Sequence, residues 1–209
     1  MTDFEKLKES VIRGRRDQVG EIVKAAIAAK EDINPLLDKG MIPAMREIGE
    51  RFSRNEAYVP ELLIAARAMQ AGLLILEPLL AASGRKPLGK IAIGTVKGDL
   101  HDIGKNLVAI MFKGAGYEVV DLGVNCDAEK FLAAFEKDGV QVIACSALLT
   151  TTMPYMQEIV SKFKGKKVKV IIGGAPVTQA YADQIGADGY SEDASKAVKL
   201  VDELLAKTA

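Results

Sequence analysis

The chain has 209 residues, enough for one large domain or two small ones. Its 28 Lys and Arg residues are balanced by 28 Asp and Glu residues, so no surplus of positive charge points to nucleic acid as a partner. Trp is absent and aromatic residues make up only 5%, which argues against surfaces that stack bases or sugars. Hydrophobic residues reach 49% and charged residues 27%, a composition typical of a soluble globular protein.

The cysteines and the apolar segments indicate where the protein works. Cys126 and Cys145 are too few for a disulfide framework, and free thiols suit a reducing cytosol. The N-terminus is mixed polar rather than a basic and apolar leader. The longest apolar stretch, residues 62–82, carries Arg67 and Glu77, which disfavour a membrane span. We therefore expect a cytoplasmic protein with no membrane partner.

Residues 1–86 are predicted to form an all-α cap domain. Apolar residues recur at spacings of three and four in an Ala- and Lys-rich background, as amphipathic helices require. Asn34 is expected to cap a helix over residues 35–54, and Pro60 to open another over residues 62–80. Four helices joined by short turns predict a four-helix bundle.

Residues 87–209 are predicted to form a Rossmann-like, flavodoxin-like α/β domain, which a turn-rich hinge over residues 83–89 joins to the cap. Short β-rich runs alternate with helical patterns, which favours a parallel five-stranded sheet covered on both faces. Ligands of such sheets bind outside the carboxyl ends of the strands. The expected strands are residues 90–95, 118–122, 140–147, 168–172 and 189–191, and the expected helices are residues 103–114, 128–138, 154–164, 178–184 and 193–206.

The glycines after the first strand do not form a phosphate-binding loop. Gly98 and Gly104 are separated by five residues rather than four, and Asn106 follows the lysine where a P-loop has Ser or Thr. No G-x-G-x-x-G dinucleotide motif is present either.

His101 is the only histidine in the chain and follows the first predicted strand. Asp99, two residues earlier, can accept a hydrogen bond from one ring nitrogen and leave the other for a metal. Asp102 suits the positive end of the helix that follows. One imidazole cannot supply the three or four protein ligands of zinc, but it suits a metal already held by a macrocycle. The alternative is an ordinary histidine with a satisfied hydrogen bond in an α/β protein.

The pattern Asp99-x-His101-x-x-Gly104 resembles the cobalamin-binding module of methionine synthase and of corrinoid methyl-carrier proteins. Ser146-x-Leu148, after the third strand, and Gly173-Gly174, after the fourth, match further motifs of that family. Residues 49–60 are similar to its cap segment, so the resemblance runs from about residue 35 to the C-terminus. Three ordered motifs on three loops are specific together, although each alone is weak.

The resemblance implies a cobalamin cofactor (methylcobalamin, cob(I)alamin or a related corrinoid) whose own base is displaced. His101 would be the lower ligand of cobalt and Asp99 its catalytic partner. Thr152 stands where methionine synthase has the serine of a His–Asp relay, and whether Thr152 completes a relay stays open. The residues implied in cofactor binding are Phe52, Val59, Gly98, Asp99, Leu100, His101, Asp102, Gly104, Ser146, Leu148, Thr150, Gly173, Gly174 and Ala194.

A chain of this kind is expected to carry a methyl group on cobalt, as a carrier subunit rather than a stand-alone enzyme. Its partners would be a substrate:corrinoid methyltransferase, an acceptor methyltransferase acting on tetrahydrofolate or a thiol, and a reductive activase. The resemblance leaves the methyl donor open among methylamines, methanol, betaines and methoxylated aromatics.

Two other functions share the central motif. The small subunit of a cobalamin-dependent mutase would carry Asp-x-His-x-x-Gly but needs no cap of this type. A cobalamin-based light sensor would add a DNA-binding domain and a Trp-containing cap motif, and Trp is absent here. Beside the main motifs, Cys126 is expected to have a packing role, and Asn125 and Asp127 are expected to cap the next helix.

Overall fold

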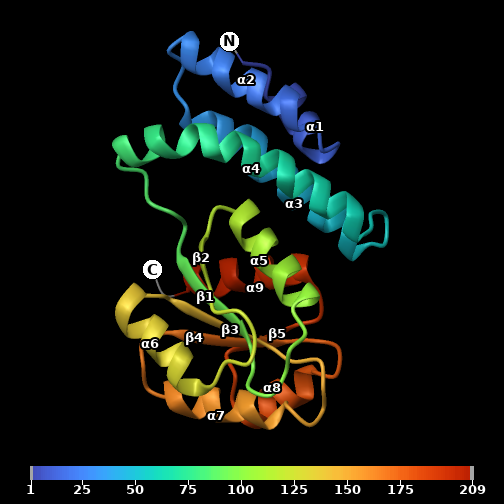
Figure 1. Cartoon of the computed structure of the whole chain (residues 1–209), viewed down its shortest axis with the longest axis vertical. Coiled ribbons are helices and arrows are strands. Elements are labelled where there is room, and N and C mark those ends of the chain that lie inside the picture. The colour runs from blue at the N-terminus through green and yellow to red at the C-terminus, as the bar shows by residue number, and fades with distance from the viewer. Residues whose placement is uncertain (1, 208–209) are drawn as a thin grey trace. The chain divides into compact units, whose positions relative to one another are not determined.

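The computed structural model describes residues 2–207 (Figure 1). The described chain forms two compact units. One comprises the chain through Lys86 together with Gly114–Gly116, and the other comprises Pro87–Lys113 and the chain from Tyr117 onward.

The first unit is helical, as predicted. In it, α4 packs against α1, α2 and α3, and the apolar side chains of Leu7, Val19, Met45 and Leu62 are fully buried. The helices are α1 (Phe4–Ile12), α2 (Arg16–Ala28), α3 (Ile42–Ser53) and α4 (Val59–Ala82), with a π-helical segment, η1 (Leu36–Met41), before α3.

The helix expected over residues 35–54 is interrupted, and the prediction of its cap was wrong. Pro43 lies in the first turn of α3 and has no N–H, so it cannot donate the α-helical hydrogen bond to the carbonyl four residues before it. The N–H of Ile42 instead bonds to the carbonyl of Leu37, five residues back. Asn34 does not cap the helix: no side chain among residues 2–207 caps η1, and the N of Asn34 itself donates to Oδ1 of Asp32 at 3.0 Å.

Helix α4 is the one helix among the described residues that is long and apolar enough to cross a membrane by length and composition alone. The segment Val59–Leu80 has a mean hydropathy of 1.5. Core helices of soluble bundles pass the same test, and α4 contacts all three other helices of its unit. Its composition is therefore only weak support for a membrane span.

The second unit is an α/β domain whose five strands are all parallel, as predicted. The strand order is β2-β1-β3-β4-β5, with α5 and α9 on one face of the sheet and α6, α7 and α8 on the other (Figure 1). The strands are β1 (Lys90–Thr95), β2 (Glu118–Asp121), β3 (Val142–Ser146), β4 (Lys169–Gly173) and β5 (Gly189–Ser191). The helices are α5 (Ile103–Gly114), α6 (Ala128–Asp138), α7 (Pro154–Phe163), α8 (Gln179–Ile185) and α9 (Ala194–Ala206).

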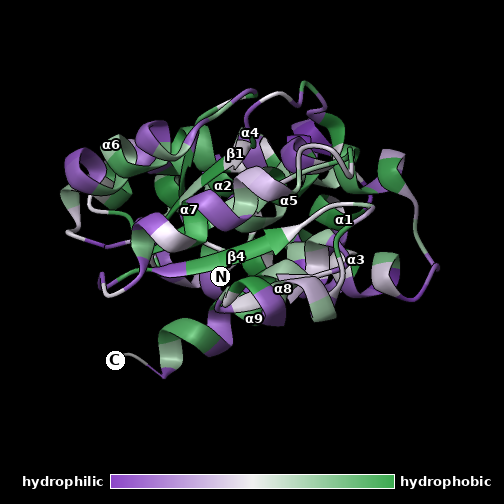
Figure 2. Ribbon diagram, turned by 90° about the horizontal axis from the view of Figure 1, so that it is seen from below, coloured by the Kyte–Doolittle hydropathy of each residue, from purple (hydrophilic) through white to green (hydrophobic). Residues whose placement is uncertain are grey.

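The central strands are apolar because helices cover both of their faces. Every residue of β1 after Lys90 is buried, and Figure 2 shows β4 mainly in the hydrophobic colour. The chain leads from β1 to β2, which lies on one side of β1 in the sheet, and then to β3, which lies on the other side of β1. The junction of β1 and β3 is thus the point where the order of strands reverses, and the loops that follow these two strands lead to helices on opposite faces of the sheet.

Gly174 follows β4 at this edge of the sheet, and its own backbone requires glycine. Its φ is +128°, a conformation that side chains rarely permit, and an added Cβ would lie 1.9 Å from the carbonyl oxygen of Ala147. The close approach allows the loops after β3 and β4 to lie against each other. The glycine is therefore needed for the fold, whether or not a ligand binds nearby.

We predict that Gly174→Ala destabilises the protein by about 3–5 kcal/mol, because both the backbone and the contact with Ala147 must rearrange. Gly139→Ala is the matched control. Gly139 also has a positive φ, of +64°, but an added Cβ would meet nothing within 4 Å. It should therefore cost only about 1–2 kcal/mol. Urea denaturation of both variants measures the difference, and equal losses would contradict the steric account.

Candidate functional site

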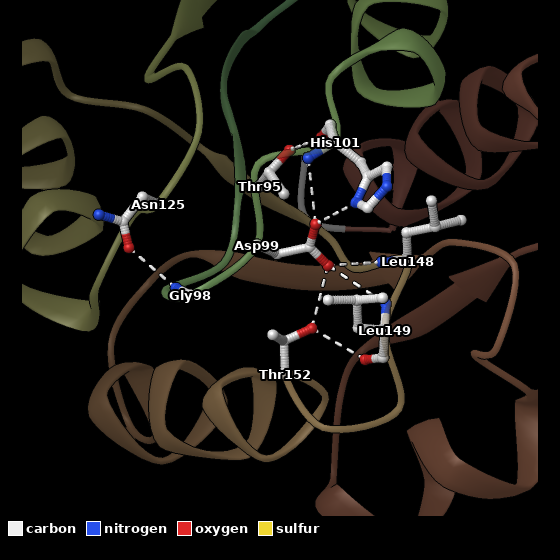
Figure 3. Close-up of polar contacts among 8 residues, drawn as sticks. All are labelled: Thr95, Gly98, Asp99, His101, Asn125, Leu148, Leu149 and Thr152. Atoms are coloured by element: carbon white, nitrogen blue, oxygen red, sulfur yellow. Dashed lines mark hydrogen bonds and ion pairs between the residues drawn. The ribbon is translucent and has the colours of Figure 1, made fainter.

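The centre of the site is the carboxylate of Asp99, whose side chain has no exposed surface. Its Oδ1 accepts hydrogen bonds from the backbone N and the ring Nδ1 of His101, at 3.1 and 2.9 Å. Its Oδ2 accepts from the backbone N of Leu148 and Leu149, at 2.8 and 3.2 Å, and lies 3.0 Å from the hydroxyl of Thr152 (Figure 3). The loops after β1 and β3 thus meet at one carboxylate.

These donors keep Asp99 ionised. Burial acts to raise the pKa of Asp99, but hydrogen bonds from Leu148, His101 and Thr152 outweigh it and hold the pKa far below the usual range of a carboxyl group. A buried charge is stable only when it is met by donors in this way. Asp99 therefore acts as a permanent negative charge behind the histidine.

The imidazole of His101 is held in one tautomer. Because the ionised Asp99 carboxylate can only accept, Nδ1 donates the hydrogen bond between them, and in the neutral ring the lone pair is then on Nε2. The ring is 55% exposed, and Nε2 has no hydrogen-bond partner in the part of the chain that the structure describes. The hydroxyl of Thr95 donates to the carbonyl of His101 at 2.8 Å and fixes the backbone that carries the ring.

Four large apolar side chains stand exposed around the histidine. Leu100 is 72% exposed, Ile103 78%, and Leu148 and Leu149 42% each. Exposed apolar residues gathered beside a polar centre mark a surface that something else covers. The combination of a free imidazole nitrogen and an apolar rim suits a broad, largely apolar ligand that brings its own metal.

Thr152 lies next to Asp99, where a member of the relay described for the family would have to lie, and its part in a relay stays a prediction. Its single hydroxyl proton can reach Asp99 Oδ2 or the carbonyl of Leu149, at 3.0 and 2.8 Å. His101, Asp99 and Thr152 therefore form a continuous hydrogen-bonded chain.

The β2–α6 loop supplies a contact that sequence reasoning missed. Asp127 caps α6 as expected, because its side chain accepts from the N of Lys130. Asn125 does not cap α6, contrary to the prediction: its Oδ1 accepts from the N of Gly98 at 2.8 Å (Figure 3). Leu149, Thr95 and Ile103 were also missed, because their roles depend on spatial neighbours rather than on a motif.

Other residues predicted from the resemblance lie along the same edge of the sheet. Ser146 ends β3, Gly173 ends β4, and Ala194 begins α9 after β5, with its methyl group buried. Thr150 is exposed in the loop after β3, and Asp102 precedes α5. Their contacts with a cofactor stay a prediction.

Gly104 differs from Gly174 in what surrounds it. An added Cβ at Gly104 would meet nothing within 4 Å, so the protein itself does not require glycine at this position of α5. Open space beside the histidine loop is what a ligand approaching the backbone needs.

Phe52 and Val59 belong to the helical unit. Phe52 lies in the last turn of α3 and Val59 begins α4, and both side chains are partly buried there. Their expected role in covering cobalt stays a prediction.

The cysteines offer no reactive thiol. Both are free and buried, and burial raises the pKa of Cys126 and, more strongly, of Cys145. Within residues 2–207 no group of three or more His, Cys, Asp or Glu side chains could hold a metal ion. A metal bound at His101 must therefore bring its other ligands with it.

Known protein families account for most of the chain. Residues 89–199 match the model of a B12 binding domain, and residues 3–77 match a second model, also described as a B12 binding domain. The dimethylamine corrinoid protein of Methanosarcina barkeri is 40% identical over 211 residues, covering 97% of each chain. The trimethylamine corrinoid protein of the same organism is 41% identical over 202 residues, covering 94% of this chain and 93% of that protein.

A solved structure agrees with these sequence relatives. A chain of the methanol:cobalamin methyltransferase complex MtaBC from Methanosarcina barkeri superposes with a TM-score of 0.85 and 31% identity, over 96% of this chain and 78% of that one. The chain belongs to the B12-binding family of corrinoid proteins, and its cofactor is a corrinoid. The predicted family, fold class and cofactor are thereby confirmed.

We predict that Asp99→Asn lowers the free energy of unfolding by about 2–4 kcal/mol at pH 7, because an amide cannot replace a carboxylate that accepts from five donors. The loss should shrink as the pH falls below about 4. The lowered pKa of Asp99 gives stability that is complete above the unfolded-state pKa, near 3.9, and is lost on acidification.

Urea denaturation of the corrinoid-free protein between pH 7 and pH 3 measures this difference. Asp127→Asn serves as the control at pH 7, where it should cost little because Asn caps helices as well as Asp does. A stability difference for Asp99→Asn that stays constant with pH would contradict the ionised state of Asp99.

Proposed function

We propose that this protein carries a methyl group on a corrinoid between a substrate-specific methyltransferase and an acceptor methyltransferase, with His101 as the lower ligand of cobalt. The observation that carries the proposal is the His101 imidazole, whose Nδ1 is held by Asp99 while Nε2 remains free. The methyl-transfer context is supported by the methylamine and methanol corrinoid relatives.

The residues of the site fit a corrinoid. His101 would hold cobalt through Nε2, and the apolar side chains of Leu100, Ile103, Leu148 and Leu149 would lie against the corrin ring. The open space at Gly104 leaves room for the displaced nucleotide tail. When bound, the corrinoid supplies a nucleophilic cobalt that accepts a methyl group and passes it on.

The protein's own contribution is to control the histidine. His101 would hold the metal through Nε2, while Asp99 accepts the hydrogen bond from Nδ1 and orients the ring. The ionised Asp99 would keep the ring in the same orientation whether or not Nε2 holds the metal. Thr152 donates a hydrogen bond to the far oxygen of Asp99 and would help to balance the charge of that carboxylate.

The helical unit would act as the cap over the upper face of the cofactor, with Phe52 and Val59 as its apolar contacts. We propose the domain division at residues 86 and 87 and place the hinge in a shorter segment than residues 83–89. Ser83 still bonds back to α4, and Arg85 forms two hydrogen bonds with Asp38, at 2.6 and 2.9 Å. The link that is free to bend is therefore residues 86–88.

Methylated amines are the methyl donors that we propose to test first, because the dimethylamine and trimethylamine corrinoid proteins are 40% and 41% identical to this chain over at least 94% of its length. The other proposed partners are an acceptor methyltransferase for tetrahydrofolate or a thiol, and a reductive activase. The protein would work in the cytoplasm, as a carrier subunit. Trimethylamine, dimethylamine and methanol, each supplied with its own donor methyltransferase, would separate the donor classes.

The axial ligand can be tested by EPR because the chain has a single histidine. We expect the Co(II) protein to show a superhyperfine triplet with ordinary histidine and a doublet with 15N-labelled histidine. His101→Ala should retain the corrinoid but lose this splitting. A triplet indifferent to the label would mean that the cofactor keeps its own base, and failure to bind any corrinoid would contradict the proposed function.

Gly104→Ala tests whether the open space at this position serves the cofactor. We expect the corrinoid-free protein to be as stable as wild type or up to about 1 kcal/mol more stable, because alanine favours helix. Corrinoid affinity should fall by about tenfold or more, because the methyl group occupies ligand space.

The matched control is Gly20→Ala in α2, where an added Cβ makes only an ordinary contact of 3.7 Å with Ile75. It should leave corrinoid affinity unchanged. Equal affinities for the two variants, measured by titration with hydroxocobalamin under reducing conditions, would remove Gly104 from the binding site.

A further inference from the structure

Asn125 has an unusual backbone for a residue with a side chain. It lies in the β2–α6 loop with φ at +53°, in the left-handed region where glycine is the usual residue and asparagine is among the better-tolerated alternatives. Glycine would meet this backbone requirement at lower cost. The presence of asparagine therefore points to a use for the side chain.

The side chain and the backbone of Asn125 both hydrogen-bond to the turn that precedes His101. Oδ1 of Asn125 accepts from the N of Gly98 at 2.8 Å, and the N of Asn125 donates to the carbonyl of Asp99 at 3.1 Å (Figure 3). The turn itself is closed by a hydrogen bond from the N of Asp99 to the carbonyl of Val96, at 3.1 Å, and Gly98 has a φ of +77° within it. Asn125 thus contacts both ends of the dipeptide Gly98–Asp99.

The rest of the β2–α6 loop lies along the same segment. The N of Cys126 donates to the carbonyl of Thr95 at 2.9 Å, and the N of Thr95 donates to the carbonyl of Gly123 at 3.0 Å. Beyond the histidine, the buried ammonium of Lys105 pairs with both carboxylate oxygens of Asp121, at 2.5 and 2.6 Å. Strand β2 and the loop that follows it therefore hold the chain on both sides of His101.

We propose that Asn125 is a positioning residue for His101. The carboxylate of Asp99 is held from one direction by the backbone N–H groups of the β3–α7 loop. It can meet Nδ1 of His101 at 2.9 Å only if the Asp99 backbone is held as well, and Asn125 supplies that restraint. The inference rests on the proposed function only in that His101 is the cobalt ligand. The positioning itself concerns the protein without cofactor.

The full-length chain labelled with 15N-histidine and prepared without corrinoid tests the positioning, because its imidazole 15N signals come from His101 alone. Wild type should show mainly the Nδ1–H tautomer. Asn125→Gly keeps the left-handed backbone but removes the acceptor, so the signals should shift toward the Nε2–H tautomer. Asn125→Asp, which retains an oxygen for the N of Gly98, should restore the wild-type pattern.

Asn55→Gly is the matched control, since Asn55 is also an exposed asparagine in the left-handed region, with φ at +59° in the helical unit. It should leave the His101 signals unchanged. A wild-type imidazole spectrum in Asn125→Gly would overturn the proposal. So would exchange of the Gly98 amide hydrogen in wild type at the rate of an unprotected amide, a measurement that requires no variant.

The EPR experiment on the Co(II) protein keeps this proposal separate from the proposed function. A label-indifferent triplet together with a shifted imidazole spectrum in Asn125→Gly would reject His101 as the metal ligand but support the positioning role. A triplet that becomes a doublet on labelling, together with an unshifted imidazole spectrum in Asn125→Gly, would support His101 as the metal ligand but reject the positioning role of Asn125.

Discussion

A carboxylate without exposed surface stays ionised only where enough donors converge on it, and Asp99 receives them from its own loop and from the loop after β3. The charge of Asp99 fixes the tautomer of His101 and leaves Nε2 with its lone pair. It also joins the two loops, because neither could hold a buried carboxylate alone. The availability of the histidine for a metal is a consequence of how this one charge is satisfied.

The order of the strands makes that convergence possible. Because β1 and β3 are neighbouring parallel strands, the loops that leave their carboxyl ends meet at the same edge of the sheet before they lead to helices on opposite faces. Asp99 and Leu148 are 49 residues apart in sequence yet are hydrogen-bonded there. The exposed apolar side chains of Leu100 and Ile103 border the same site, where the corrinoid of this family would cover them.

The sequence allowed the parallel sheet to be predicted, because apolar strand runs depend on local chemistry, whereas the three-motif site was predicted from a family resemblance. It did not distinguish between glycines that look alike. Gly174 is required by the carbonyl of Ala147, whereas Gly104 faces open space. From the sequence, Asn125 and Asp127 were both expected to cap α6, because both precede that helix. Only the neighbouring loop shows that Asn125 bonds to Gly98 instead.

The sequence by itself determined the helical and α/β halves, the strand-end histidine and the aspartate two residues before it. These features follow from hydrophobic periodicity and from residues close together in the chain. Tertiary structure decided that Thr152 reaches Asp99, that Pro43 interrupts the predicted helix with a π-helical segment, and that the β2–α6 loop holds the histidine loop. Such contacts depend on which loops the strand order places side by side, and a residue's immediate sequence neighbours carry no record of that order.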